Sequence, residues 1–413
     1  MTINRLTPLL LLLALSACST KKVTPPKTDT NSTDTSLIKN NIVKNPALAN
    51  STVINAGVPH TGVVNRPIYH APTSLMTSPP INPMLGRAII EQSSSTTTGG
   101  VGGYFAGNYK LINFIDRMCN EYQFDREYLY QLFSSAENVH QFVEEYRAKS
   151  NTNSKPQGKW DRYKGMFIYE RNINRGVAFW EKHKNALNKA YQQYGVLPEF
   201  IVGILGVETA YGVNFGKRRV IDVLTTKAML PNRRESFYTT QLEKFLLMTR
   251  HSHLDASTLM GSNAGAMGYG QFIASSYLEF AVDFNNDGVI DLWNAEDAIG
   301  SVANYFARNG WNRGIRQVAV RAKYRGSRFR KLKTGYKTKY SQYRLRKKYK
   351  ITPRTRLSYK GPVSLIKLPK FSYDELWFGT HNFRVITTYN HSTFYAMAVF
   401  KLGEAVKARR YGR

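Results

Sequence analysis

The stretch "PEFIVGILGVETAYG", Pro198–Gly212, decides how the rest of this 413-residue chain is interpreted. Proline at its start suits the first turn of a helix, and the apolar run after it is typical of a buried helix that ends at Tyr211. Near the end of the run stands one carboxylate, Glu208, three residues after Leu205 and four after Ile204. These spacings place Glu208 on the apolar face of the helix.

Burial on that face would raise the pKa of the Glu208 carboxyl group. A carboxyl group that keeps its proton near neutral pH can act as a general acid in catalysis. The alternative is structural: Glu208 lies exposed at the helix end, or pairs with Arg218 or Arg219. Helical spacing leaves both possibilities open, so the choice depends on the rest of the chain.

The composition is that of a globular protein with a strong positive charge. Hydrophobic residues make up 42% of the chain and aromatic residues 13%, which is enough for a sizeable core. The formal net charge of +30 implies an acidic partner: nucleic acid, an anionic membrane or an acidic polymer. The length allows roughly two or three domains.

The N-terminus predicts export from the cytoplasm. Residues 1–18, "MTINRLTPLLLLLALSAC", combine one arginine with an apolar run that is too short to span a membrane. The ending "LSAC" resembles a bacterial lipobox, in which Cys18 carries the lipid, and Ser19 after it favours the outer membrane. The alternative is an ordinary cleaved signal peptide with a chance cysteine. A lipidated Cys18 would leave Cys119 without a disulfide partner.

Residues 19–103 are rich in Ser, Thr, Asn and Pro, which predicts a tether with little structure. From residue 104 onward, apolar residues recur at helical spacing as far as Gln193. The same pattern returns in "SFYTTQLEKFLLMTRHS", "AEDAIGSVANYFARNG" and "HNFRVITTYNHSTFYAMAVFKLGEAVKARR". Asn390 or Ser392 can cap the last of these helices.

Residues 316–370 have a different character, with 20 Lys and Arg and no Asp or Glu. The stretches "QVAVRAKY" and "VSLIKL" read as strands. We therefore expect a small basic β-containing subdomain in a fold that is mainly α (α+β). Its charge would hold the protein against an anionic wall or lipid surface.

The stretch "GSNAGAMGYGQF", residues 261–272, is rich in glycine and also contains Ser262, Tyr269 and Gln271. It lacks the Lys-Ser/Thr ending of a phosphate-binding P-loop. Its glycines would let the backbone approach a ligand closely, although a glycine-rich connector has the same composition.

The stretch "DFNNDGVID", which starts at residue 283, begins as an EF-hand calcium loop does. Position 12, usually a bidentate Glu, is Asn294, while Asp291 at position 9 can contribute through water. Alternating oxygen ligands predict a structural Ca²⁺, unless the segment is an acidic turn without metal. The ligands expected at positions 1, 3, 5 and 7 are Asp283, Asn285, Asp287 and the carbonyl of Val289.

Four motifs together resemble the membrane-bound lytic murein transglycosylase B family. In chain order they are "GVETAYG", "GSNAGAMGYGQFIASSY", "AIGSVANYF" and "YNHSTFYAMAV". The resemblance covers about residues 104–413, is weakest in the basic segment, and agrees with the lipobox. One departure is Tyr211, where the family often has Trp, and this would affect sugar packing more than chemistry.

The resemblance implies a lysozyme-like helical catalytic core with an additional helical region. It also implies cleavage of the β-1,4 bond between N-acetylmuramic acid and N-acetylglucosamine, giving 1,6-anhydro-N-acetylmuramic acid without water. Most glycosidases need two carboxylates. Here one is enough, because the substrate N-acetyl group stabilises the oxocarbenium-like centre and the 6-hydroxyl attacks it. By this resemblance Glu208 is the acid and afterwards the base.

The resemblance also assigns other site residues by motif. Ser262 and Asn390 match a hydroxyl and an amide near the acid. Arg233 and Arg234 match a basic pair that binds the stem peptide, with a solvated surface as the alternative. Asp297 matches the acid that closes an extended calcium loop. Positions that line the cleft, or else pack in the core, are Tyr269, Gln271, Tyr305, Tyr389 and Tyr395.

Together these features predict a lytic transglycosylase of cell-wall turnover, carried by an outer-membrane lipoprotein of a Gram-negative bacterium and facing the periplasm. Expected partners are peptidoglycan strands with their stem peptides, the membrane through the lipid anchor, and other proteins of cell-wall synthesis or hydrolysis. We expect no organic cofactor and no physiological nucleic acid. The alternatives are a muramidase that uses water and a non-catalytic peptidoglycan-binding lipoprotein. Anhydro products and the variant Glu208→Gln would distinguish them.

Overall fold

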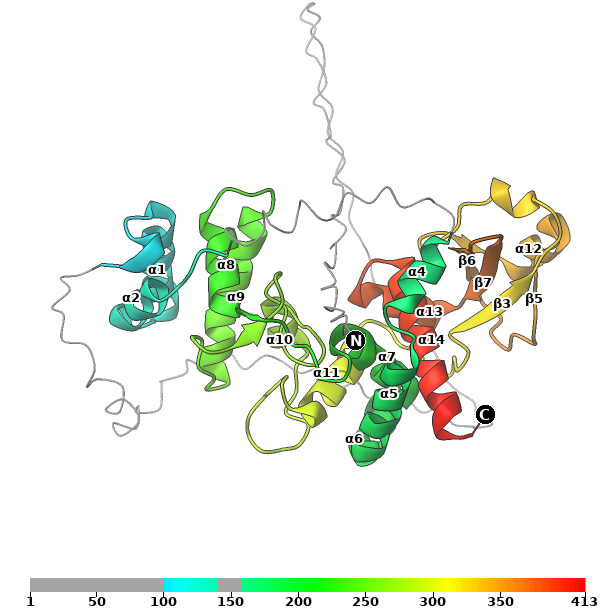
Figure 1. Ribbon diagram of the computed structural model, residues 1–413, viewed down its shortest axis with the longest axis horizontal. Coiled ribbons are helices and arrows are strands. Elements are labelled where there is room, and N and C mark those ends of the chain that lie inside the picture. Colours follow the sequence, from blue (N-terminus) through cyan, green and yellow to red (C-terminus); the bar gives the residue numbers. More distant parts are fainter. Residues whose placement is uncertain (1–99, 140–157, 413) are drawn as a thin grey trace, which may run out of the picture. The chain divides into compact units, whose positions relative to one another are not determined.

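The stretch Pro198–Thr209 forms helix α7 of the computed structural model (Figure 1). Ten of its 12 residues are buried, because the apolar run leaves it almost no polar face. Proline stands at the first helical turn, as predicted. The helix ends two residues before the predicted Tyr211, because Ala210 and Tyr211 take left-handed backbone angles, with φ of 50° and 64°.

The structure describes residues 100–139 and 158–412, which fall in one contact unit of the chain. The predicted signal segment 1–18, with Cys18, and nearly all of the predicted tether lie outside the described residues. Within these ranges no helix has both the length and the apolarity needed to cross a bilayer. Cys119 is partly buried and unpaired there.

Helix α14, Thr393–Arg410, packs antiparallel to α7 at very short distance. A Cβ atom at Gly203 would lie 2.4 Å from the carbonyl oxygen of Val399, and one at Gly403 would lie 2.1 Å from that of Glu199. Glycine at both positions therefore lets the two backbones touch.

Further helices pack around this pair and complete the part of the chain that carries α7. Their amphipathic faces meet the same core that buries α7. They are α4 (Lys159–Gly165), α5 (Glu170–Lys182), α6 (Lys184–Tyr194), α11 (Ala295–Arg308) and α13 (His381–Tyr389).

A second group of helices precedes and follows α7 in sequence and forms the additional helical region (Figure 1). In it α8 and α10 both pack against α9. Two ion pairs join α1 to α9, with Lys110 at 2.6 Å from Glu235 and Arg117 at 2.5 Å from Glu243. The members are η1 (Gly103–Phe105), α1 (Tyr109–Tyr122), α2 (Arg126–Ser134), α8 (Val220–Met229), α9 (Glu235–His251) and α10 (Ala274–Phe280).

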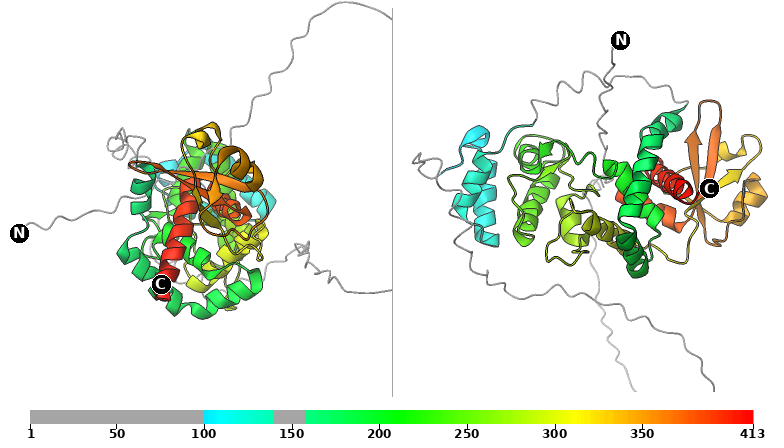
Figure 2. Two further views of the ribbon diagram at one scale, coloured as in Figure 1. Left: turned by 90° about the vertical axis from the view of Figure 1, so that its right-hand side faces the viewer. Right: turned by 60° about the horizontal axis from the view of Figure 1, so that its bottom comes forward.

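Five antiparallel strands form a sheet in the order β4-β6-β7-β3-β5 (Figure 2, orange and yellow). The predicted strands in "QVAVRAKY" and "VSLIKL" are β3 and β6, and the sheet continues past residue 370 because β7 pairs with both. The segment also contains helix α12, Gln342–Tyr349, and the short η3, Arg328–Lys331. The strands are β3 (Ala319–Lys323), β4 (Lys339–Tyr340), β5 (Thr352–Pro353), β6 (Val363–Pro369) and β7 (Asp374–Gly379).

The two faces of this sheet pack into different cores. Leu365 pairs with Phe378 and both belong to a small core on the side of α12. The next pair, Ile366 and Trp377, belongs to the main helical core. This is the alternation of side chains along a strand, and it attaches the sheet firmly to the helices. The described structure is thus mainly helical with a small sheet, as the sequence predicted.

Candidate active site

Glu208 lies in the last turn of α7 and is only partly buried, whereas its neighbours Val207 and Thr209 are buried. Its Oε1 accepts a hydrogen bond of 2.5 Å from the hydroxyl group of Tyr395. Burial raises the pKa of Glu208 to about 7, although the hydrogen bond from Tyr395 lowers it. Because the effect of burial outweighs that of the hydrogen bond, Glu208 is protonated in a large fraction of the molecules near neutral pH. Its side chain nevertheless stays partly accessible.

Tyr395 is placed by the start of α14. The Oγ of Ser392 accepts a hydrogen bond of 3.3 Å from the backbone N–H of Tyr395, so Ser392 caps this helix and the other candidate, Asn390, does not. Burial and the charge of Glu208 raise the pKa of Tyr395 well above its usual value, so the hydroxyl stays a donor. Since Tyr395 is fully buried, it holds Glu208 and lines no open surface.

Two of the other tyrosines predicted near the site, Tyr305 and Tyr389, form a stack with Tyr395. The rings of Tyr389 and Tyr395 lie 6.4 Å apart and nearly parallel, and Tyr305 meets Tyr389 edge-on at 4.8 Å. The hydroxyl of Tyr389 donates a 2.5 Å hydrogen bond to the carbonyl of Gly270. Tyr305 and Tyr389 are partly buried, and burial raises the pKa of both. The stack therefore connects the glycine-rich loop to Glu208.

The glycine-rich loop, residues 261–272, is tied directly to the chain that follows α7. The hydroxyl of Thr209 donates to the carbonyl of Tyr269 at 3.1 Å, and the amide of Gln271 donates to the carbonyl of Phe215 at 3.2 Å. A Cβ at Gly216, where φ is 103°, would lie 1.8 Å from the carbonyl oxygen of Gly261. At this position glycine lets the chain after α7 contact the glycine-rich loop, so the close approach is between two parts of the protein and not to a ligand.

The same contact pairs strand β1, Arg218–Arg219, with strand β2, Met260–Gly261. Arg219 makes a 2.8 Å ion pair with Asp222. Arg219 therefore pairs with Asp222 and not with Glu208, whose partner is the hydroxyl group of Tyr395.

Ser262 and Asn390 keep hydrogen-bonding capacity for a ligand. The Oγ of Ser262 accepts from the backbone N–H groups of Ala264 and Ala266, at 3.2 and 3.1 Å, which leaves its own proton free to donate. Asn390 follows α13 and is partly buried, and its side-chain amide has no hydrogen bond within the described residues.

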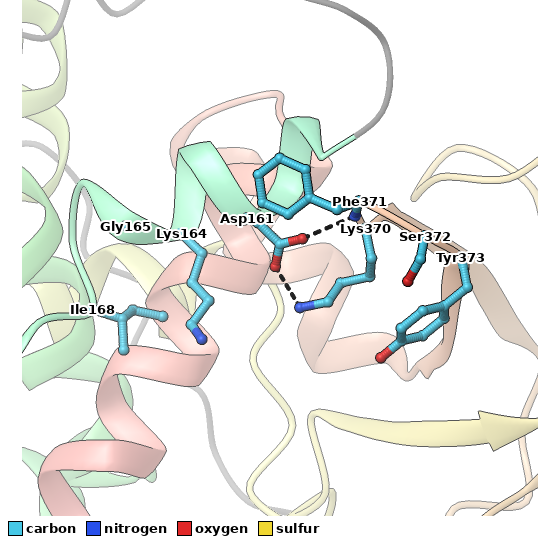
Figure 3. A pocket seen from close by; sticks show the side chains of 8 residues that line it. All are labelled: Asp161, Lys164, Gly165, Ile168, Lys370, Phe371, Ser372 and Tyr373. Carbon is cyan, nitrogen blue, oxygen red and sulfur yellow. Dashed lines mark hydrogen bonds and ion pairs between the residues drawn. The ribbon is translucent and has the colours of Figure 1, made fainter.

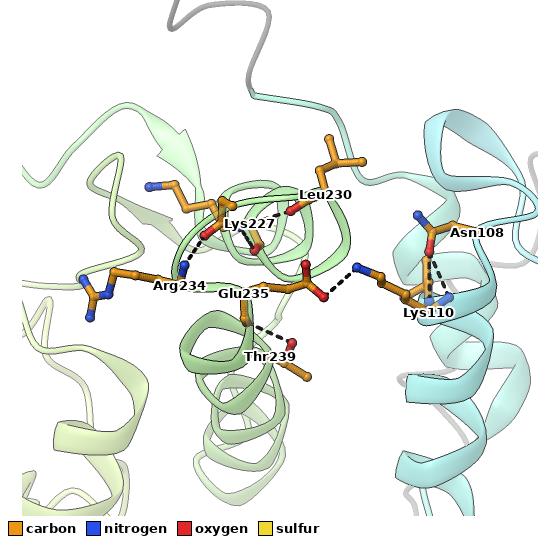
Figure 4. Close-up of polar contacts among 9 residues, drawn as sticks. Asn108, Lys110, Lys227, Leu230, Arg234, Glu235 and Thr239 are labelled. Carbon is orange, nitrogen blue, oxygen red and sulfur yellow. Dashed lines mark hydrogen bonds and ion pairs between the residues drawn. The ribbon is translucent and has the colours of Figure 1, made fainter. Parts of the chain in front are cut away.

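Arg233 and Arg234 lie at the start of α9. Arg233 is exposed, and the Arg234 guanidinium stacks over Phe237 at 3.9 Å. Figure 4 shows the Arg234 side chain pointing away from the Lys110–Glu235 ion pair. No hydrogen bond or ion pair within the described residues connects either arginine to Glu208.

Lys227 of α8 supplies a connection between this arginine pair and the glycine-rich loop. Its Nζ donates a 2.5 Å hydrogen bond to the carbonyl of Asn263, next to Ser262. Burial, and then the charge of Arg234, lowers the pKa of Lys227. Lys227 and Arg234 both lie over the ring of Tyr238, so Lys227 stands between Arg234 and the residue beside Ser262.

The predicted calcium loop is folded around its own side chains. Asp283 accepts hydrogen bonds from the backbone N–H groups of Asn286 at 2.7 Å and Gly288 at 2.9 Å, and Asp287 accepts from Val289 at 2.9 Å. Gly288 takes a φ of 88°, as the sharp turn requires. The carboxylate and carbonyl oxygens of the loop are ligands of the kind that Ca²⁺ prefers. In residues 100–139 and 158–412, however, no three His, Cys, Asp or Glu side chains lie close enough together to share a metal ion.

Asp297 closes this loop, at the place where an acid was expected. It is fully buried, and its Oδ1 accepts from the N–H of Phe284 at 2.7 Å while its Oδ2 accepts from that of Asp291 at 2.8 Å. Burial raises the pKa of Asp297, although these backbone hydrogen bonds lower it. Here Asp297 binds the two ends of the loop together.

Three further residues at the site were not singled out from the sequence: Tyr163, Thr209 and Lys227. Burial, and then the charge of Glu208, raises the pKa of Tyr163 to about 12. A hydroxyl beside the carboxylate in "VETA" was a signal for Thr209, but nothing local marked Tyr163 or Lys227.

Tyr211 corrects an expectation. It is 8% exposed, and its ring packs where Gly176 and Gly206 leave space, with its hydroxyl 2.4 Å from a Cβ built at either position. Tyr211 is therefore part of the core and does not offer a face to sugar, because its left-handed backbone turns the ring back over α7.

Comparison with families of known proteins identifies one match over most of the chain. The family model of the transglycosylase SLT domain matches residues 108–404. Membrane-bound lytic murein transglycosylase B of Escherichia coli (strain K12) is 45% identical over 315 residues, which cover 75% of this chain and 86% of that protein.

Solved structures have the same fold. The Escherichia coli lytic transglycosylase Slt35 in complex with bulgecin A shares 45% sequence identity and a TM-score of 0.70, over 76% of this chain and 97% of that chain. With the same values, Slt35 is also known in complex with calcium. SltB3 from Pseudomonas aeruginosa in complex with NAG-anhNAM-pentapeptide is 26% identical, with a TM-score of 0.61 over 72% of this chain and 78% of that chain.

Proposed function

The chain belongs to the transglycosylase SLT domain family and is a lytic murein transglycosylase, and from this premise we propose that Glu208 is the single acid and base of its reaction. The observation that carries the proposal is the placement of Glu208. Glu208 lies partly accessible in the last turn of an apolar helix, and its pKa is raised to about 7. The hydroxyl group of the buried Tyr395 donates a hydrogen bond to one of its oxygens.

The reaction begins with a proton transfer from Glu208 to the glycosidic oxygen between N-acetylmuramic acid and N-acetylglucosamine. The C1–O4 bond breaks, N-acetylglucosamine leaves with the proton, and the substrate N-acetyl group stabilises the positive charge at C1. The 6-hydroxyl of the muramic residue then attacks C1 and returns its proton to Glu208. Atoms balance without water, the product is the 1,6-anhydro sugar, and Glu208 is restored.

The hydrogen bond from Tyr395 suits both halves of this cycle. It occupies Oε1, so the transferable proton of Glu208 resides on the other oxygen. It also stabilises the carboxylate that remains after the proton has left.

Ser262 and Asn390 bind the substrate beside Glu208. The free proton of the Ser262 hydroxyl suits the N-acetyl group and the sugar hydroxyls. So does the Asn390 side-chain amide, which has no hydrogen bond in the part of the chain that the structure describes. Of the tyrosines, Tyr269, Tyr305 and Tyr389 are partly exposed and line the cleft, while the buried Tyr395 positions the acid.

Arg233, Arg234 and Lys227 bind the stem peptide through its carboxylates. Their support is the position of Lys227 and Arg234 over the ring of Tyr238, together with the hydrogen bond from Lys227 to Asn263, next to Ser262. The relative SltB3 is known with a pentapeptide-bearing fragment, which favours this assignment. The variant Arg234→Ala should have a raised KM for peptide-bearing strands and an unchanged KM for peptide-free strands.

The loop after α10 holds a structural Ca²⁺, with ligands from Asp283, Asn285, Asp287, the Val289 carbonyl and Asp297. The fit rests on their oxygen donors and on the turn at Gly288, and on the calcium complex of Slt35. Binding would require the carboxylates to exchange backbone hydrogen bonds for the ion. Calcium titration should raise the melting temperature of the wild type and not that of Asp283→Asn. An unchanged melting temperature together with no bound calcium would reject the site.

Cys18 is the lipid attachment site of an outer-membrane lipoprotein that faces the periplasm. Support comes from the lipobox in the sequence and from the membrane-bound relative. Labelling of growing cells with palmitate should mark the wild type and leave Cys18→Ala unmarked.

The decisive test is the identity of the product. Purified sacculi digested by the wild type should release muropeptides that end in 1,6-anhydro-muramic acid, which mass spectrometry distinguishes from the hydrated sugar. Reducing ends would instead identify a muramidase that uses water. Release that persists in Glu208→Gln would remove Glu208 from the mechanism.

A further inference from the structure

The basic segment, residues 316–370, is almost entirely without counter-charges. Of its 20 Lys and Arg, only Arg321, Lys367 and Lys370 lie within 4.0 Å of a carboxylate in the described part of the chain. The remaining 17 have no such ion pair there. The three carboxylates that do pair lie outside the segment and are Glu375, Asp374 and Asp161.

Four of these unpaired cations line one groove over the paired ends of β3 and β5, with a volume of about 540 Å³. All four are exposed, and one of them, Lys350, takes a left-handed φ of 56° at the end of α12. Glycine is favoured at such a position, so a cation is kept there at some conformational cost. We call the groove formed by Lys323, Arg325, Lys350 and Arg354, together with Arg321, Tyr324 and Thr352, the basic groove.

A pair of exposed aromatic residues stands beside the groove. The turn between β6 and β7 carries Phe371, 62% exposed, and Tyr373, 47% exposed, which we call the aromatic tip. Arg321 of the groove donates to the hydroxyl of Tyr373 at 3.4 Å, so groove and tip are adjacent.

The aromatic tip is held rigidly. Asp161 of α4 accepts hydrogen bonds from the Lys370 ammonium group and from the backbone N–H of Phe371, the latter at 3.2 Å (Figure 3). The Phe371 ring also covers Gly158, where an added Cβ would lie 2.4 Å away. Two exposed aromatic rings are therefore presented on a fixed turn.

We infer that the basic groove and the aromatic tip together form a docking surface for a bilayer of anionic phospholipid. Phosphate groups enter the groove, where each unpaired cation gains an anionic partner, while the tip lies among the headgroups. Aromatic side chains with polar neighbours are favoured in that layer. An acidic polymer needs the cations alone, whereas exposed aromatic rings beside cations suit the headgroup layer of a bilayer.

The test is sedimentation of the full chain with phosphatidylcholine vesicles, with and without phosphatidylglycerol. The ratio of the two partition coefficients isolates the anionic contribution, because any lipid anchor acts equally in both. Each cation near an anionic surface contributes about fivefold. Neutralising three groove residues, Lys323→Gln, Arg325→Gln and Lys350→Gln, should therefore lower the ratio about a hundredfold.

The matched control removes three exposed cations from the helical part: Arg171→Gln, Lys182→Gln and Lys184→Gln. It has the same net charge as the groove variant, so a similar loss in both would overturn a specific site. A wild-type ratio near one would also overturn it. If the groove variant keeps its ratio but loses binding to purified sacculi, the occupant is the wall and the inference is wrong.

The aromatic tip is tested separately with Phe371→Ser and Tyr373→Ser together. Binding to phosphatidylglycerol vesicles should fall about tenfold, because less apolar surface enters the headgroup layer. All variants should keep the wild-type melting temperature and release of anhydro-muropeptides from sacculi in excess, since none of these residues touches the Glu208 site. Unchanged vesicle binding by the tip variant would show that the aromatic rings take no part.

Discussion

The end of helix α7 and the basic groove of the sheet use charge in opposite ways. At α7 a single carboxylate, Glu208, is partly buried, and burial raises its pKa to about 7. In the groove four cations are exposed and have no ion pair in the described structure. The difference shows that burial alters the chemistry of one group, while exposure keeps many groups charged and free to meet a partner.

The largest effect should come from removing the buried carboxylate. Glu208→Gln is expected to slow release of anhydro-muropeptides from sacculi by about a thousandfold, because an amide cannot donate the proton that a general acid supplies. The control is Glu127→Gln, an exposed carboxylate of α2, which should keep full activity. A Glu208→Gln enzyme that retained a tenth of the activity would show that Glu208 is not the general acid.

The same substitution should affect stability in a way that depends on pH. The pKa of Glu208 is raised to about 7 in the folded state, above its ordinary value, so the folded state binds the proton more tightly than the unfolded state. Glu208 therefore costs stability as pH rises between about 4.5 and 7, with the full cost above that window. At about pH 8, Glu208→Gln should gain up to about 3 kcal/mol in the free energy of unfolding.

Urea unfolding of both proteins at about pH 4 and pH 8 measures this effect. The two should be nearly equally stable at the lower pH, where Glu208 carries its proton in both states. An equal difference at both pH values would mean that the carboxylate is not penalised by burial.

A smaller effect is expected from Tyr395→Phe. This change removes the hydrogen bond that lowers the pKa of Glu208, so the pKa should rise further. The decline of kcat/KM on the alkaline side should move up by about one pH unit, since a hydrogen bond to a charged group is worth about 1.5 kcal/mol. Tyr109→Phe, at an exposed position, should leave the pH profile unchanged.

The smallest effect belongs to the groove. Neutralising Lys323, Arg325 and Lys350 should change the free energy of unfolding by less than about 0.5 kcal/mol, because exposed charges without partners contribute little to folding. Any change should be a gain at low salt that disappears at high salt, since like charges repel. Loss of more than about 2 kcal/mol on urea unfolding would show that these cations support the fold.

Much of the fold could be predicted because its signals are local. The apolar run of α7, its initial proline and the alternating pattern of β6 are periodicities that can be read within a few residues. The helix end was misplaced by two residues, since Ala210 and Tyr211 adopt left-handed angles that their side chains do not announce. Strand β7 lay beyond the predicted basic segment, because acidic Asp374 and Glu375 interrupt the charge pattern but not the pairing.

The site was predicted less completely, because its contacts join distant parts of the chain. The partner of Glu208 stands 187 residues away, and the carbonyl that Thr209 binds is 60 residues away. Lys227 reaches the loop from α8, across 36 residues. The burial of Tyr395 and of Tyr211 depends on how α5, α7 and α14 pack, which no local pattern contains.

The amino-acid sequence sets where charge and apolarity lie: one carboxylate at the end of an apolar helix, and twenty cations with no acid among them. It also determined the order of the four motifs, because these are properties of residue identity alone. Tertiary packing gives Glu208 a pKa of about 7 and a tyrosine partner, and it leaves the groove cations without an ion pair among the described residues. Burial and pairing depend on which segments meet in space, and packing of the whole chain sets that.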